Sequence, residues 1–117
     1  MSLQLKRVYD PPEASDGKRV LVDRVWPRGL SKKEARIDEW LRELGPSTEL
    51  RRWFGHDPSR WDDFRQRYRH ELHQPDQRQR LEHLRELSRS QSLTILYGAR
   101  DREHNQAVVI AEEVQGG

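Results

Sequence analysis

A short apolar run that stops abruptly at charged residues constrains the fold of this sequence more than any other feature. Residues 20–34 read VLVDRVWPRGLSKKE. Three aliphatic residues lead into Asp23 and Arg24, and after a Trp-Pro-Arg-Gly turn Ser31 and Glu34 form a capping box that starts a helix. A buried strand that carries polar groups to the rim of an α/β sheet has this order of residues. The stretch predicts where a site lies, although it does not identify a reaction.

Three segments have the pattern of strands. Residues 3–9 alternate apolar and polar side chains and end before two prolines, which cannot extend a ladder. Residues 18–25 have a continuous apolar centre, which is typical of a strand buried on both faces of a parallel sheet. Residues 93–97 form another apolar run, closed by Gly98.

Four helices are predicted between the second and third strands, and one after the third. The first begins at the capping box, carries an apolar stripe of period 3.6 through Leu44, and ends at Gly45. The next three start near residues 47, 57 and 76. A last helix over about 101–114 contains β-branched residues that leave a strand as the alternative. This order predicts one compact α/β domain over residues 1–117, with a small three-stranded, mainly parallel sheet flanked by about five helices.

Composition excludes several classes of protein. The chain has no cysteine, which removes disulfides, thiolate metal sites and cysteine nucleophiles. It has no apolar stretch long enough for a membrane span and no signal-peptide core, so we expect a cytoplasmic protein without a membrane partner. Its 22 basic and 20 acidic residues alternate along helices, which is typical of solvated faces rather than of a nucleic-acid surface. The common motifs of NTPases, serine hydrolases and zinc proteases are absent.

Polar and aromatic residues follow each predicted strand. In open parallel sheets, ligands bind outside the carboxyl ends of the strands, provided that the strands run in one direction. Arg28 directly precedes a helix start, where it can clamp a phosphate or carboxylate, or else pair with a nearby aspartate. For Asp23, an ion pair with an arginine is favoured over direct chemistry. The candidate ligand-binding residues at the three strand ends are Tyr9, Asp10, Arg24, Trp26, Arg28 and Tyr97.

An aromatic stripe over residues 53–68 has helical spacing and is interpreted as core. Arg60 flanks this stripe and is a further candidate for ligand binding. His56 lies in the tight turn between two predicted helices, where it can serve as an acid or base. The favoured alternative is that His56 packs the turn while Asp57 caps the next helix.

Asp101 and His104 are one helical turn apart. Such a pair can orient an imidazole for proton transfer or metal binding. The alternative is that Asp101 caps the last helix and His104 faces solvent. His70 and His73 also share a face near a helix end, but no third ligand lies nearby in sequence, so they are interpreted as surface residues. No metal site is assigned and no cofactor is identified. The candidate catalytic residues are Asp23, His56, Asp101 and His104.

Four segments together resemble the YeaO-like family of small bacterial proteins, part of a larger group of domains of unknown function. They are RVYDPP at residues 7–12, VDRVWPRGLS at 22–31, WFGHDP at 53–58 and DREHN at 101–105. The resemblance implies a compact α/β domain and supplies no established activity. The wider group often has cysteines after the last strand and in the helix that follows. This chain has Tyr97 and Asn105 there, so thiol chemistry is not expected.

These patterns favour a domain whose cleft binds an anionic small molecule, such as a phosphorylated nucleotide or sugar, with or without acid–base chemistry. Arg24 and Arg28 would hold the anion, and Trp26 or Tyr97 would wall the ligand. One alternative is a non-enzymatic interaction module with a protein or, less favoured, a nucleic-acid partner. A second alternative is a metal-dependent hydrolase.

Overall fold

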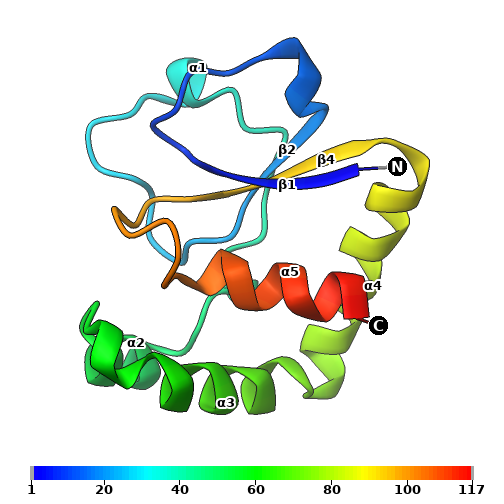
Figure 1. Ribbon diagram of the computed structural model, residues 1–117. Coiled ribbons are helices and arrows are strands. Elements are labelled where there is room, and N and C mark those ends of the chain that lie inside the picture. The colour runs from blue at the N-terminus through cyan, green and yellow to red at the C-terminus, as the bar shows by residue number, and fades with distance from the viewer. Residues whose placement is uncertain (1, 117) are drawn as a thin grey trace.

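The sheet of this protein contains four strands that all run in the same direction. A computed structural model describes residues 2–116 (Figure 1). Its strands are β1 (Ser2–Arg7), β2 (Lys18–Leu21), β3 (Glu39–Trp40) and β4 (Ser92–Tyr97), in the spatial order β1-β4-β2-β3. Every neighbouring pair is parallel, so the carboxyl ends of all four strands lie at one rim. The α/β class and the shared strand direction are therefore confirmed.

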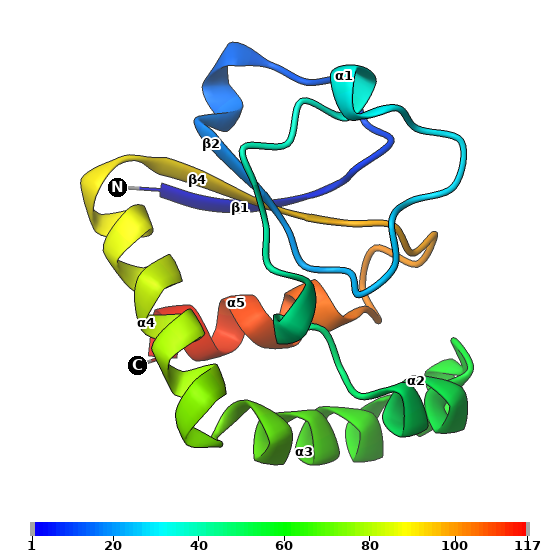
Figure 2. The same cartoon turned by 180° about the vertical axis from the view of Figure 1, so that it is seen from behind.

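Within residues 2–116, five α-helices and three short 3₁₀ helices surround the sheet. α4 and α5 contact it on one face, and α3 packs against both of them on the side away from the strands (Figure 1). Seen from behind, α1 lies across the opposite face (Figure 2). No helix among residues 2–116 has the length and apolarity that crossing a membrane requires. The bounds are α1 (Lys32–Ala35), α2 (Thr48–Phe54), α3 (Trp61–Leu72), α4 (Pro75–Ser90), α5 (Gln106–Gly116), η1 (Ala14–Asp16), η2 (Arg42–Leu44) and η3 (Pro58–Arg60).

The core has two parts, one on each face of the sheet. On the helical face, Val20 and Ile95 belong to a cluster that includes residues of α2, α3, α4 and α5. On the other face, Leu21 and Leu96 pack with Ala35 and the partly buried tryptophans that precede and follow α1. All four strand residues are completely buried. The prediction that residues 20–22 are covered on both faces is thus confirmed.

The prediction of a three-stranded sheet is wrong, because the helix expected to run through Leu44 ends at Ala35. Arg36 adopts a left-handed conformation, with φ of 48°. The buried guanidinium of Arg19 donates hydrogen bonds to the carbonyls of Ala35, at 2.9 Å, and Arg36, at 3.1 Å. The chain that follows is therefore held beside β2, where residues 39–40 pair as β3. The long-range contact with Arg19 overrides the local helical pattern.

Other element boundaries differ from the prediction by a few residues. β2 ends at Leu21, so Asp23 and Arg24 belong to the loop after the strand. The last element, α5, is a helix and not the alternative strand. Asn105 caps this helix, since its Oδ1 accepts the amides of Ala107 and Val108 at 2.9 and 3.3 Å.

A candidate ligand-binding cleft at the carboxyl ends of the strands

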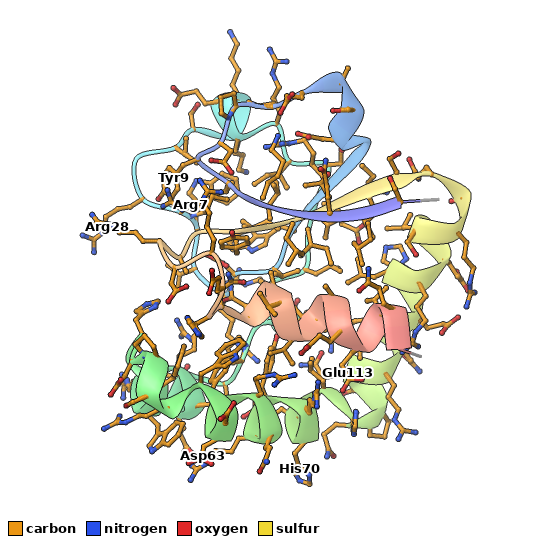
Figure 3. The ribbon with its side chains drawn as sticks, in the orientation of Figure 1. Arg7, Tyr9, Arg28, Asp63, His70 and Glu113 are labelled. Atoms are coloured by element: carbon orange, nitrogen blue, oxygen red, sulfur yellow. The ribbon has the colours of Figure 1, made fainter. Side chains whose placement is uncertain are left out.

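Two adjoining cavities lie at the rim where β2 and β4 end. The helix-side cavity, of about 330 Å³, is walled by α2, Phe64 and the segment 104–106 before and at the start of α5. The strand-side cavity, of about 280 Å³, follows the loop 23–28 that leaves β2. Tyr9 and Arg28 lie together at this end of the molecule (Figure 3). Residues shared by the two cavities form their junction, and these are Pro46, Arg51, His56, Ala99 and Gln106.

Asp23 places a carboxylate in the strand-side cavity without an arginine partner. Its Oδ2 accepts the Gly98 amide at 3.0 Å, and its Oδ1 accepts the Gln106 side-chain amide. A Cβ atom at position 98 would lie 2.7 Å from Oδ2, so a glycine is needed for this close approach. Burial raises the pKa of Asp23 to about 6, against the lowering effect of the Gly98 and Gln106 hydrogen bonds. The expected ion pair is replaced by amide donors, which stabilise the charge less completely.

The predicted arginines have different surroundings. The Nε of Arg24 donates to the carbonyls of Gly45 at 3.0 Å and Pro46 at 2.7 Å, and its guanidinium ties this loop to the end of β2. Arg28 is exposed, and its side chain projects from the surface (Figure 3). Its guanidinium has no hydrogen bond or ion pair with any residue that the structure describes. Only its carbonyl is engaged, by the Tyr9 hydroxyl at 2.8 Å.

Two further arginines line the cleft, and reasoning from the strand ends did not find them. Arg51 and Arg52 lie in α2, which folds across the rim. The side chain of Arg51 makes one hydrogen bond, of 3.4 Å, to Thr48, and Arg52 makes none within residues 2–116. Neither forms an ion pair with a described carboxylate. The only sequence signal for them is their position in the helix after Gly45, and that signal does not reveal that the helix lies beside the strands.

His56 lies at the junction in an unusual backbone conformation. Gly55 and His56 both have positive φ, of 54° and 55°. A residue other than glycine with positive φ is uncommon and costs conformational energy, and such residues cluster at functional sites. The turn directs the residue to the border of both cavities.

Asp101 and His104 form the hydrogen-bonded pair that their spacing predicts. The Nδ1 of His104 lies 2.9 Å from the Asp101 Oδ2, and the ring meets Trp61 edge-on at 5.3 Å. Hydrogen bonds from the amides of Glu103 and His104 and from the imidazole lower the pKa of Asp101. The ring is thus fixed from two sides. With the proton on Nδ1, Nε2 remains an acceptor, and the residue lines the helix-side cavity.

The remaining predicted residues are placed apart from the cleft interior or at its edge. Asp10 receives two bonds of 2.9 Å from Arg102, which lower its pKa. Tyr97 is 2% exposed and belongs to the core. Arg60 donates to the Trp53 carbonyl and lines neither cavity. Tyr9 and Trp26 do line the strand-side cavity, and Trp26 packs edge-on against Trp40 with its Nε1 bonded to the Leu30 carbonyl at 2.7 Å.

The described part of the chain assembles no group of three or more histidine or acidic side chains that could hold a metal ion. Asp101 and His104 lie together, but Asp23 is bonded to Gly98 and Gln106 instead. The metal-dependent alternative therefore has no ligand set in this structure.

Comparisons with known proteins agree along almost the whole chain. Residues 2–116 match the profile DUF488-N3i, described as the inactive DUF488-N3 subclade. Escherichia coli YeaO, named an uncharacterized protein, is 46% identical over 112 residues, 96% of each chain. Mycobacterium tuberculosis Rv3073c, also named uncharacterized, is 38% identical over 114 residues, 97% of this chain and 94% of its own. No solved structure matches the chain significantly.

Proposed function

The chain belongs to the YeaO-like family, in the inactive DUF488-N3 subclade, and from that premise we propose that it binds a small phosphorylated molecule in the cleft at the carboxyl ends of its strands. Binding without turnover fits the description of the subclade. A cytoplasmic location is part of the proposal, because phosphorylated metabolites are found there and the chain has no cysteine to oxidise.

The observation that carries the proposal is the imbalance of charge in the cleft. Four arginines line the two cavities, and Asp23 is the single carboxylate among the lining residues. Elsewhere in the structure arginines commonly pair with acids, as Arg65 and Arg69 do with Glu112. Guanidinium groups gathered without partners raise the local concentration of anions and match the geometry of phosphate oxygens. The lining arginines that form no ion pair with a carboxylate of residues 2–116 include Arg28, Arg51 and Arg52.

Arg51 offers the sharpest test, because it lies at the junction of the cavities. Replacing Arg51 with glutamine is expected to weaken binding of ribose 5-phosphate about tenfold, since a charge-assisted hydrogen bond is lost. Titration calorimetry at low salt measures the change. Arg78→Gln is the matched control, because Arg78 is an exposed arginine of α4 that lies outside the cleft. Its affinity should equal that of the unmodified protein.

Equal affinities for the two variants would contradict the assignment of the cleft. Absence of binding by ribose 5-phosphate, nucleotides and inorganic phosphate alike would overturn the proposed function. Salt-sensitive binding of an oligonucleotide without binding of small phosphates would support the nucleic-acid alternative instead.

A further inference from the structure

Building on the proposed function, we infer that the phosphorylated ligand is a nucleoside phosphate, with its phosphate at the junction of the two cavities and its base in the helix-side cavity. This inference narrows the ligand class. It rests on how charged and aromatic side chains are divided along the cleft.

Of the four lining arginines, Arg51 lies where the cavities meet, and aromatic rings line each cavity. Arg51 and His56 line both cavities. A phosphate held by these two residues leaves the helix-side cavity open to the rest of the ligand. That space, of about 330 Å³, lies at the lower end of the range typical of small-molecule sites. Inorganic phosphate would leave it empty.

The helix-side cavity has the walls that a planar base requires. The imidazole of His104 is held by Asp101 and by the edge contact with Trp61, so ordering it on binding costs little entropy. Phe54 and Phe64 also line this cavity and stack on each other, with centroids 4.3 Å apart. Stacking on an aromatic ring is a favourable contact for every base, since each base has a π-face.

Arg52 adds a planar cation at the same cavity. Its guanidinium has no partner within residues 2–116, and such a group stacks on aromatic faces. A sugar phosphate has no aromatic ring that could stack on the guanidinium or on the imidazole. The aromatic and guanidinium groups therefore favour a nucleoside phosphate over a sugar phosphate.

The two amide side chains at this cavity are engaged within the protein and do not read the edge of a base. The amide of Asn105 donates to the Asp101 carbonyl at 2.9 Å and accepts from the first turn of α5, so both of its ends are occupied. The side-chain amide of Gln106 donates to Asp23. Recognition by stacking without edge contacts predicts similar affinities for adenosine and guanosine monophosphates.

The test compares adenosine 5′-monophosphate, ribose 5-phosphate and inorganic phosphate by titration calorimetry with the unmodified protein. We expect the nucleotide to bind at least about fivefold more tightly than ribose 5-phosphate, because stacking supplies the difference. Equal affinities for these two ligands would overturn the inference and leave the proposed function intact. No binding by any of the three would overturn both.

Substitution of His104 locates the base. His104→Ala is expected to remove most of the nucleotide's advantage and leave ribose 5-phosphate binding unchanged, whereas His104→Phe keeps a ring and retains the advantage. Thermal melting confirms that each variant is folded, and the comparison of ligands on the unmodified protein decides the matter if one is not. An undiminished advantage in folded His104→Ala would place the base elsewhere and contradict the inference.

Discussion

Replacement of Asp16 by alanine is expected to lower the free energy of unfolding by about 3–5 kcal/mol, because it leaves a buried arginine without its counter-charge. Asp16 is 1% exposed and Arg19 is 4% exposed, and their side chains are paired directly. The carboxylate also accepts the Lys6 ammonium at 2.9 Å, the Gln4 amide at 3.2 Å and the Glu13 backbone amide at 3.1 Å. Alanine satisfies none of these donors.

The loss spreads because Asp16 and Arg19 join several elements. The Asp16 carbonyl accepts the hydroxyl of Thr94 in β4 at 2.7 Å. Arg19 holds the carbonyls of Ala35 and Arg36, which position the chain leading into β3. An unpaired guanidinium would be drawn toward water, and these carbonyls would lose their donor. β3 is therefore expected to loosen together with the ion pair.

Acid should produce part of the same loss in the unmodified protein. Burial by itself would raise the pKa of Asp16. The hydrogen bonds from Lys6, the Glu13 amide and Arg19 lower this pKa by more than burial raises it, so the pKa lies below its ordinary value of 3.8. The stabilisation is complete above the unfolded pKa and is lost as the pH falls through the lower, folded pKa.

Urea unfolding followed by circular dichroism at pH 7 measures the effect of Asp16→Ala. Asp63→Ala is the control, because Asp63 is exposed on the side of α3 that faces away from the sheet (Figure 3). It lies in the first turn of the helix, where its loss costs at most about 1 kcal/mol. Similar losses of unfolding free energy in Asp16→Ala and Asp63→Ala would show that the buried ion pair stabilises the protein no more than an exposed aspartate does.

The Asp16–Arg19 pair also marks the limit of what the sequence predicts about the fold. The apolar run at residues 20–22 and the capping box at Ser31 are local patterns, and both led to the right elements. β3 could not be foreseen, because residues 36–41 are held beside β2 by contacts that are distant in sequence. These include the bonds of the Arg19 side chain to the carbonyls of Ala35 and Arg36, and the bonds between the Arg19 backbone and Asp38. A contact across 16 or 17 residues leaves no trace in a pattern of period 3.6.

The same limit applies to the cleft. Strand ends placed Asp23, Trp26 and Arg28 at the rim because chain direction alone determines where they lie. Arg51 comes from α2, and its position depends on packing that no local pattern encodes. Tyr97 was placed at the rim, although its spacing from Leu93 and Ile95 puts it on the same face of β4, which is covered by helices. Strand alternation was the available signal for that residue.

Asp23→Asn is expected to raise the free energy of unfolding at pH 7 by about 2–3 kcal/mol. A carboxyl whose pKa is 3.8 in the unfolded chain and about 6 in the folded protein makes the folded state less stable wherever it is ionised. Asparagine keeps the shape and carries no charge to desolvate. Its Oδ1 can accept the Gly98 amide, and its Nδ2 can donate to Gln106 once that amide has rotated, so no donor is left unsatisfied.

The sign of the pH dependence follows from the same difference. Between pH 4 and pH 6 the folded protein binds the proton of Asp23 more tightly than the unfolded chain does, so stability contributed by this group falls as the pH rises through this interval. The unfolding free energies of Asp23→Asn are subtracted from those of the unmodified protein at intervals from pH 4 to pH 7. The difference isolates the effect of Asp23, because the contributions of the histidines are the same in both proteins. Asp63→Asn should show no such difference. A parallel pair of pH profiles for the unmodified protein and Asp23→Asn would contradict the raised pKa.

A carboxylate that lines the cleft is also expected to repel a bound anion. The same variant therefore connects stability to binding. If the phosphate lies beside Arg51, removing the negative charge of Asp23 should strengthen binding of inorganic phosphate at pH 7 by a few-fold, on the order of the interaction between two charges near a protein surface. The gain should vanish at pH 5, where the unmodified protein is itself protonated at Asp23. An increase in affinity that is equal at both pH values would show that the charge of Asp23 does not act on the anion. The stability lost through Asp23 would then arise only from its packing against Gly98 and Gln106.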